Sequence, residues 1–206
     1  MKIVMYGDSV TDSCRNEQGL SRFGHGYVRF IAGELLFKDP KKYQLVNKGI
    51  SGNKIVDLYA RVKKDVWNQE PDVLSILVGV NDVWHEIDGQ NGVDLVRWEK
   101  VYRMLIEETK ALFPNIKIIL CEPFILPGSA TNENYERFLE VKNYAKKAKQ
   151  LADEYGLPFV SLQDKLDKKA QEIGAENCLV DGVHPEVAGA KLIADEWLKV
   201  FYGLEK

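Results

Sequence analysis

Near the start of the chain, residues 2–9 read KIVMYGDS, a short apolar run that ends in a glycine, an aspartate and a serine. Four similar runs follow it, with Gly or Pro at or near most of their ends, and they alternate with longer segments of helical period. Such alternation is typical of βαβ units around a parallel sheet that is covered on both faces. The predicted strands are Lys2–Tyr6, Tyr43–Asn47, Asp72–Val78, Asn115–Cys121 and Pro158–Leu162.

The segments between and after these strands predict the helices that cover the sheet. The last of them is clearly amphipathic, because one stripe holds its apolar residues. These are Val187, Ala190, Ala194, Trp197, Leu198 and Phe201. Five parallel strands with helices on both sides predict a three-layer α/β/α sandwich of the flavodoxin-like type. The predicted helices are Tyr27–Phe37, Lys54–Trp67, Val93–Phe113, Glu133–Tyr155, Gln163–Ile173 and Pro185–Tyr202.

Length and composition favour one compact domain. The chain has 206 residues, of which 45% are hydrophobic, so we expect residues 1–206 to form a single domain with a sizeable core. The net charge is only −3, with basic residues scattered between acidic ones, which favours neither a nucleic-acid nor a membrane-surface partner. No stretch approaches a transmembrane span, and the apolar run at the N-terminus is too short for the core of a signal peptide.

The chain contains three cysteines, Cys14, Cys121 and Cys178, far apart in the sequence. Their odd number and wide spacing fit neither a zinc site nor a disulfide framework. We therefore expect a cytoplasmic location and no metal or other cofactor. The sequence does not choose between a monomer and a homo-oligomer.

Four motifs with chemically useful side chains lie mostly at the ends of predicted strands. They are Gly7-Asp8-Ser9, Asn47–Gly52, Gly79–Asp82 and Asp181–Pro185, the last of which contains an Asp-x-x-His spacing. Parallel sheets bind ligands beyond the carboxyl ends of their strands, so these motifs are expected to meet at one edge. Together they supply a nucleophile, a base with its acidic partner, and hydrogen-bond donors, which are the components of acyl transfer.

At these motifs the sequence closely resembles the SGNH (GDSL-like) hydrolase family. The four signature residues of that family are matched here by Ser9, Gly52, Asn81 and His184. The resemblance spans nearly the whole chain. The runs Asn47–Asn53 and Gly79–Trp84 look most like those of bacterial acetylxylan esterases that act on xylo-oligosaccharides, whereas Ser13–His25 and Phe124–Arg137 depart from that subfamily.

This resemblance implies a serine esterase that takes an acetylated sugar as its small-molecule substrate. Ser9 would attack the ester carbonyl after giving its proton to His184, and Asp181 would orient the imidazole. The resemblance assigns the oxyanion hole to the backbone N–H groups of Ser9 and Gly52 and to the side-chain amide of Asn81.

Each of these residues also has a purely structural explanation. The Gly7-Asp8-Ser9 motif can be a strand-to-helix turn with a capping residue, and Asn81 and Asp82 can cap the end of a strand. The remaining histidines are weaker candidates for the base, because His25 lies between two glycines in a loop and His85 follows Trp84.

Trp84 follows the Gly79–Asp82 motif directly. It is either a platform for a sugar ring or an ordinary buried tryptophan. We expect the platform because Asn81 is so close in sequence.

Two other functions remain open at this point. The same catalytic groups would serve a lysophospholipase or thioesterase with a longer acyl pocket. The alternative from another class is a non-catalytic flavodoxin-like binding module, a nucleotide or phospho-signal receiver in which Asp8 and Asp12 bind a cation. The sequence lacks the glycine-rich phosphate loops of nucleotide-binding folds, and a receiver module would not explain the Asp-x-x-His motif.

Overall fold

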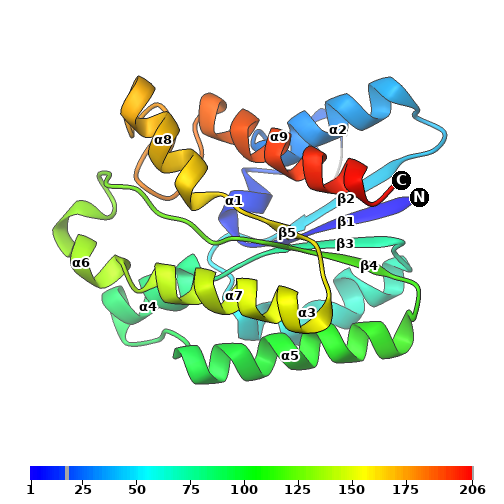
Figure 1. Cartoon of the computed structure of the whole chain (residues 1–206), viewed down its shortest axis with the longest axis horizontal. Coiled ribbons are helices and arrows are strands. Elements are labelled where there is room, and N and C mark those ends of the chain that lie inside the picture. Colours follow the sequence, from blue (N-terminus) through cyan, green and yellow to red (C-terminus); the bar gives the residue numbers. More distant parts are fainter. Residues whose placement is uncertain (17–18, 206) are drawn as a thin grey trace.

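The computed structural model describes residues 1–16 and 19–205, and the centre of the described chain is a parallel sheet (Figure 1). Its five strands run in the order β2-β1-β3-β4-β5, and all neighbours are parallel. The predicted five-stranded parallel sheet is confirmed. The strands are β1 (Lys2–Gly7), β2 (Gln44–Gly49), β3 (Val73–Leu77), β4 (Lys117–Cys121) and β5 (Phe159–Val160).

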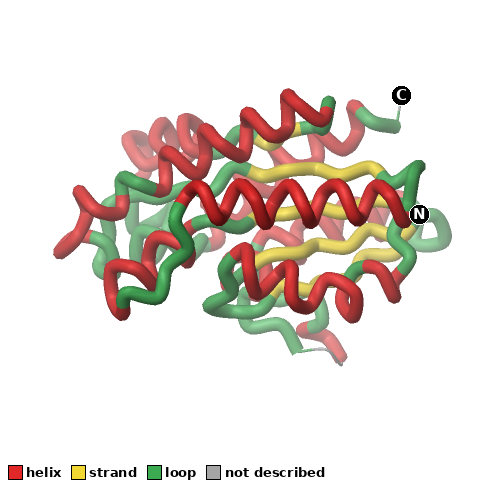
Figure 2. Tube along the Cα trace, turned by 90° about the horizontal axis from the view of Figure 1, so that it is seen from below, coloured by secondary structure: helices red, strands yellow, loops and turns green. Residues whose placement is uncertain are grey.

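Helices cover both faces of the sheet, which completes the predicted three-layer sandwich (Figures 1 and 2). The upper layer in Figure 1 contains α1 (Ser9–Asp12), α2 (Tyr27–Lys38), α8 (Gln163–Ile173) and α9 (Val187–Gly203). The lower layer contains α3 (Ile55–Asp65), α4 (Val80–Gly89), α5 (Leu95–Leu112), α6 (Tyr135–Phe138) and α7 (Val141–Tyr155). Short 3₁₀ turns lie at Gly19–Ser21, Trp67–Gln69 and Asn132–Asn134. No helix of the described residues is long and apolar enough to cross a membrane.

The central strands are apolar because helices cover both of their faces. In β1, residues Ile3 to Tyr6 are fully buried. The strand register sets the level at which the strands end, since Gly7 pairs with Gly49 of β2 and with Leu77 of β3. The loops that follow these three strands therefore start side by side at one edge of the sheet.

Helix α4 corrects the sequence-based prediction, which treats residues 79–82 as a loop. Asn81 and Asp82 lie in the first turn of this helix rather than capping a strand. The residue before the helix, Gly79, has a φ of 146°, a conformation that side chains rarely allow. The glycine that suggested a loop is therefore the residue through which the chain enters a helix.

The predicted helix Glu133–Tyr155 is also wrong as one continuous element. It is divided into the turn at Asn132–Asn134, α6 and α7. Between α6 and α7 the backbone forms tighter bonds three residues apart, from the Lys142 N–H to Leu139 and from the Asn143 N–H to Glu140. This break sends α6 toward α4.

The other predicted strands and helices end within about two residues of the observed ones. The apolar stripe predicted for α9 is largely correct, because its members from Ala190 to Phe201 are buried. Val187 is the exception and is 66% exposed. It is the first residue of α9, and the buried residues of this helix begin at Gly189.

Two helical glycines allow a test of this packing. A Cβ at Gly189 of α9 would overlap the backbone carbonyl of Cys178, whereas a Cβ at Gly33 of α2 would meet no atom within 4 Å. We expect Gly189→Ala to destabilise the protein by about 1–3 kcal/mol through overpacking. Gly33→Ala should instead stabilise it by about 0.5–1 kcal/mol, because alanine restricts the unfolded chain. Denaturant unfolding of both variants would measure this, and equal stabilities would contradict the close packing of α9.

Candidate active site

The candidate nucleophile lies where β1 turns into α1. The Asp8 carboxylate accepts a hydrogen bond from the Val10 N–H at 3.0 Å, so Asp8 caps this short helix and Ser9 is its first residue. Asp8 is only 1% exposed. Burial raises its pKa to about 7, although the Val10 N–H partly offsets this effect. The structural explanation of the motif is thus correct for Asp8, and it leaves the Ser9 hydroxyl available.

Ser9, His184 and Asp181 form one hydrogen-bonded chain. The Ser9 Oγ lies 2.9 Å from the Nε2 atom of His184, and the Nδ1 atom of His184 lies 2.7 Å from Oδ2 of Asp181. The other Asp181 oxygen accepts the backbone N–H groups of Val183 and His184 at 2.9 and 2.8 Å. These local bonds hold the acid and the imidazole in a fixed relative orientation.

The loop between β4 and α6 supports this turn from behind. The Leu126 N–H donates to the Gly182 carbonyl at 2.9 Å, and the Ala130 N–H donates to the Asp181 carbonyl at 3.0 Å. Gly128 is packed so closely that a Cβ there would overlap the backbone of Asp181. Part of the Phe124–Arg137 stretch, which the sequence left unassigned, therefore serves to position the Asp181–His184 turn.

The two charged partners shift each other's ionisation. The Asp181 hydrogen bond raises the pKa of His184, and partial burial opposes this shift. Burial alone would raise the pKa of Asp181, but hydrogen bonds from the His184 ring and from two backbone N–H groups lower it to about 2. Asp181 is therefore ionised at neutral pH and stabilises an imidazolium next to Ser9.

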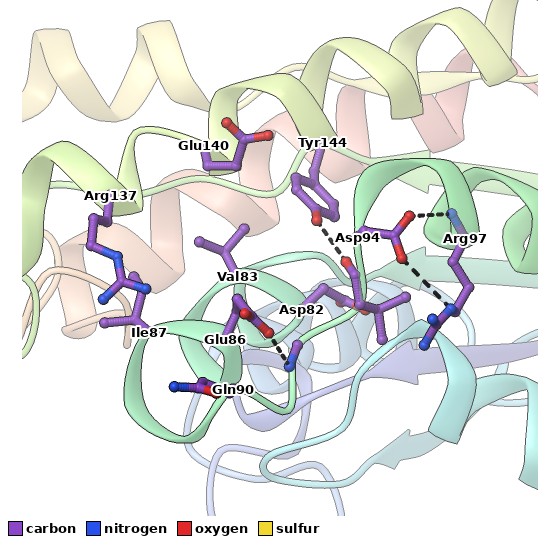
Figure 3. A pocket seen from close by; sticks show the side chains of 12 residues that line it. Asp82, Val83, Glu86, Ile87, Gln90, Asp94, Arg97, Arg137, Glu140 and Tyr144 are labelled. Carbon is purple, nitrogen blue, oxygen red and sulfur yellow. Dashed lines mark hydrogen bonds and ion pairs between the residues drawn. The ribbon is translucent and has the colours of Figure 1, made fainter.

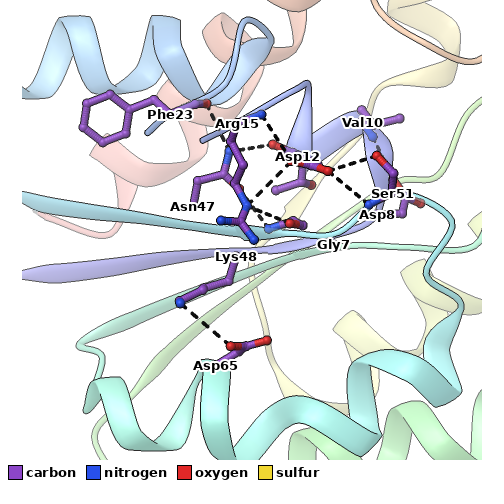
Figure 4. A network of polar contacts seen from close by, with 12 residues as sticks. Gly7, Asp8, Val10, Asp12, Arg15, Phe23, Asn47, Lys48, Ser51 and Asp65 are labelled. Carbon is purple, nitrogen blue, oxygen red and sulfur yellow. Dashed lines mark hydrogen bonds and ion pairs between the residues drawn. The ribbon is translucent and has the colours of Figure 1, made fainter. Parts of the chain in front are cut away.

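The loop after β2 is held against α1 by a polar network (Figure 4). One Asp12 oxygen accepts the Ser51 N–H at 3.2 Å and the Ser51 hydroxyl at 2.9 Å. The Arg15 Nε donates to the Gly49 carbonyl at 2.8 Å, and the side chain of Asn47 caps the Gly49 N–H at 2.9 Å. The loop leads to Gly52, whose φ of 79° favours glycine.

Asn81 lies beside this loop in the first turn of α4. Its side-chain amide donates to the Asn53 carbonyl at 3.1 Å. The neighbouring Asp82 accepts the Ile55 N–H at 3.0 Å through one oxygen, while its other oxygen has no hydrogen-bond partner among the described residues. Burial raises the pKa of Asp82 to about 8, which favours the neutral acid. Helices α3 and α4 are thereby joined next to Gly52.

A cavity of about 610 Å³ brings these groups together. Trp84 is half-buried in its wall, with its ring centroid 5.6 Å from that of Phe138 and 6.1 Å from that of His184. His25 is an exposed loop residue outside this cavity, whereas His85 belongs to its wall. The cavity is lined by Ser9, Ser51, Gly52, Asn81, Trp84, His85, Asp88, Gly89, Asn91 and His184.

Five of the cavity residues are not among the predicted site residues: Ser51, His85, Asp88, Gly89 and Asn91. The signal for two of them is helical spacing, because Asn81, His85 and Asp88 are four and three residues apart on α4. Because α4 was not predicted from the sequence, this spacing did not identify them as cavity residues.

A second pocket of about 580 Å³ lies on another side of α4 (Figure 3). Asp82, Val83 and Glu86 line it from α4, and Tyr144 lines it from α7, where its hydroxyl donates to the Val93 carbonyl at 2.6 Å. Among the described residues that line this pocket there is no member of the Ser9–His184–Asp181 chain. Helix α4 thus forms a wall of two separate pockets.

Comparisons with known proteins agree with this arrangement. Residues 5–192 match the GDSL-like lipase/acylhydrolase family. The chain is 36% identical over 207 residues to an acetylxylan esterase from Geobacillus stearothermophilus, and the match covers 96% of this chain and 92% of that protein.

Two solved structures are similar over nearly their whole length. One is a crystal structure of a putative GDSL-like lipase from Parabacteroides merdae, with a TM-score of 0.91, 36% identity, and coverage of 97% of this chain and 94% of that one. The other is a catalytic mutant of Axe2, the acetylxylan esterase from Geobacillus stearothermophilus, with a TM-score of 0.86, 35% identity, and coverage of 97% and 93%.

The Asp181–His184 pair predicts a measurable titration. We expect the His184 imidazole to titrate above its ordinary pKa of 6.5, and Asp181→Asn to lower that value because the charged hydrogen bond is lost. The folded-state pKa of His184 lies above the unfolded one, so its pairing with ionised Asp181 stabilises the fold below pH ~6.5 and is lost as the pH rises through the folded-state pKa of His184, or as it falls toward the Asp181 pKa of about 2. NMR titration of the histidine ring protons would measure the His184 pKa in the wild type and in Asp181→Asn. An equal or higher value in Asp181→Asn would contradict the pairing.

Proposed function

Because the chain belongs to the GDSL-like lipase/acylhydrolase family, we propose that it is a serine esterase that removes O-acetyl groups from xylo-oligosaccharides or related sugars. The family resemblance drawn from the sequence is thereby confirmed. The observation that carries the proposal is the hydrogen-bonded Asp181–His184–Ser9 chain, which opens on the same cavity as Gly52 and Asn81. The match to an acetylxylan esterase supports the acetylated sugar as substrate.

The first half of the reaction forms an acyl-enzyme. Ser9 Oγ attacks the ester carbonyl carbon while its proton moves to Nε2 of His184, 2.9 Å away. The Asp181 carboxylate on Nδ1 stabilises the imidazolium that results. His184 then returns the proton to the departing sugar hydroxyl as the carbon–oxygen bond of the ester breaks. In the second half a water repeats these steps and releases acetate and free Ser9.

The negative charge on the carbonyl oxygen is received by donors that are in place beforehand. The proposal assigns the backbone N–H groups of Ser9 and Gly52 and the side-chain amide of Asn81 to this role. One amide hydrogen of Asn81 is engaged with the Asn53 carbonyl. Its second amide hydrogen remains to bind the oxyanion.

The cavity is larger than an acetyl group requires and carries the features of a sugar site. About 610 Å³ lies within the range of small-molecule pockets. Trp84 supplies an aromatic face in its wall, and His85, Asp88 and Asn91 supply polar groups for sugar hydroxyls. We assign the alcohol part of the ester, rather than a long acyl chain, to this space.

The alternative of a cation-binding module loses its support. Asp8 is buried and caps α1, and Asp12 is engaged with Ser51. A lysophospholipase or thioesterase would use the same catalytic groups, and acyl length is the property that separates it from an acetylesterase. All three cysteines lie in the described part of the chain and are free thiols, which is in keeping with the proposed cytoplasmic location.

The proposal is tested by turnover. The protein should release acetate from acetylated xylo-oligosaccharides and should prefer an aryl acetate to an aryl octanoate, because extra methylenes add binding only where a pocket receives them. Ser9→Ala should lose about 10³-fold or more of kcat, and His184→Ala should approach the same loss. The double variant should be little worse than either single one, because the two residues act as a unit.

Thermal melts of each variant serve as the control for folding. A folded Ser9→Ala protein that kept more than a tenth of wild-type kcat on aryl acetate would rule out Ser9 as the nucleophile. A preference for the octanoate would show that the protein is a longer-chain acyl hydrolase rather than an acetylesterase.

Trp84 provides the test of the sugar site. If its ring packs against the sugar equally in the ground and transition states, Trp84→Ala should raise KM for an acetylated xylo-oligosaccharide and leave its kcat almost unchanged. Hydrolysis of an aryl acetate should be nearly unaffected.

Trp67→Ala is the matched control, because Trp67 is also half-buried but donates to Thr109 outside the cavity. This variant should lower the melting temperature without changing KM. If Trp84→Ala instead loses activity equally on both substrates and its melting temperature falls strongly, Trp84 is a packing residue and not a sugar platform.

A further inference from the structure

Arg61 of α3 is bonded to several segments at the carboxyl edge of the sheet. Its Nη2 donates to the Gly7 carbonyl at 3.0 Å and its Nη1 to the Lys48 carbonyl at 2.8 Å. Its Nε donates to the side-chain oxygen of Asn53 at 2.6 Å. One guanidinium group thereby joins the ends of β1 and β2 to the loop that contains Gly52.

Two of the residues that Arg61 bonds, Gly7 and Asn53, lie close to the proposed oxyanion donors. Gly7 lies two residues before Ser9, and Asn53 directly follows Gly52. The carbonyl of the same Asn53 accepts the side-chain amide of Asn81. Arg61 therefore holds the residues that adjoin the Ser9 and Gly52 N–H groups, and Asn81 is joined to the same loop through the Asn53 carbonyl.

The guanidinium is itself held in place. Its Nη1 also bonds Asp65 at 2.8 Å, and its plane lies over the Tyr6 ring with the central carbon 4.4 Å from the ring centroid. The side chain is 14% exposed. A planar group with several fixed donors can satisfy these divergent acceptors together, whereas a lysine ammonium is a compact point charge.

We infer that Arg61 is a positioning residue that sets the geometry of the oxyanion site, an inference that rests on the proposed function. Arg61 does not line the cavity among the described residues, so it acts through Gly7 and Asn53 rather than on the substrate. Donors that are slightly displaced bind the neutral carbonyl almost as well, but they lose part of their interaction with the charge that develops in the transition state. Removal of Arg61 should therefore affect kcat far more than KM.

Arg61→Lys tests this with the least disturbance of charge. On an aryl acetate we expect kcat to fall about 10- to 100-fold, the range that a small displacement of reacting groups produces, with KM within about twofold. Methylboronic acid, which adds to the Ser9 hydroxyl as a tetrahedral anion, should bind more weakly by about the same factor as the fall in kcat/KM.

Asn53→Ala is a second test of the same connection, and it leaves Arg61 and its ion pair with Asp65 in place. It removes only the acceptor of the Nε bond, so it should lower kcat in the same direction by a smaller factor. The double variant should be little worse than Arg61→Lys alone, because both changes break the same connection.

Arg103→Lys is the matched control. Arg103 also makes several ion pairs, with Glu99 and Glu154, but on α5 and α7 away from the cavity. We expect it to change the melting temperature at most and to leave kcat and methylboronic acid binding at wild-type values.

These measurements distinguish failure of the Arg61 positioning role from failure of the proposed esterase function. Unchanged kcat in folded Arg61→Lys, or a rise in KM alone, would overturn the positioning role while Ser9-dependent hydrolysis by the wild type continued to support the proposed function. A fall in kcat without weaker boronic acid binding would also overturn it. A wild-type protein without Ser9-dependent esterase activity would refute the proposed function, and the inference would fall with it.

Discussion

The register of three parallel strands is the constraint on which the rest of the site depends. Because β1, β2 and β3 end at the level set by the pairs Gly7–Gly49 and Gly7–Leu77, their following loops share one edge. The approach is so close that a Cβ at Gly7 would overlap the Leu77 carbonyl, and one at Gly49 would overlap the Asp12 backbone. The hydrogen bonds of Asp12, Arg15 and Arg61 then fix loops that the sheet has already aligned.

Two buried carboxyl groups lie beneath this edge. Asp8 and Asp82 are each 1% exposed, and burial moves their pKa values to about 7 and about 8. Each accepts a backbone N–H at the start of a helix, Val10 for Asp8 and Ile55 for Asp82. Each therefore carries less negative charge near neutral pH than an exposed carboxylate does. Asp181, which is less buried and more richly hydrogen-bonded, keeps its charge.

Much of the fold was predictable because buried parallel strands appear as uninterrupted apolar runs and their carboxyl ends meet at one edge. The Asp181–His184 contact was predictable as well, because it closes within a single turn. The contact between His184 and Ser9 spans 175 positions and follows only from the assembled sheet. Helix α4 was not predicted because Gly79 resembles a loop signal. For the same reason His85 and Asp88 were not predicted to line the cavity. The Arg61 bonds to Gly7 and Lys48 have no sequence signature, since their acceptors are backbone carbonyls brought together by packing.

Helix α4 and the proposed catalytic residues come from different parts of the sequence. The proposed nucleophile begins α1 and its acid and base lie in the turn before α9, near the two ends of the chain, whereas the ten-residue helix α4 supplies Trp84, His85 and Asp88 to the cavity wall. None of these three residues belongs to the Ser9–His184–Asp181 chain, although Asn81, a proposed oxyanion donor, lies on the same helix. Under the proposed function, substitutions at Trp84, His85 and Asp88 would therefore offer a route by which substrate preference evolves, or is engineered, within a single short helix while the hydrolytic chemistry is kept.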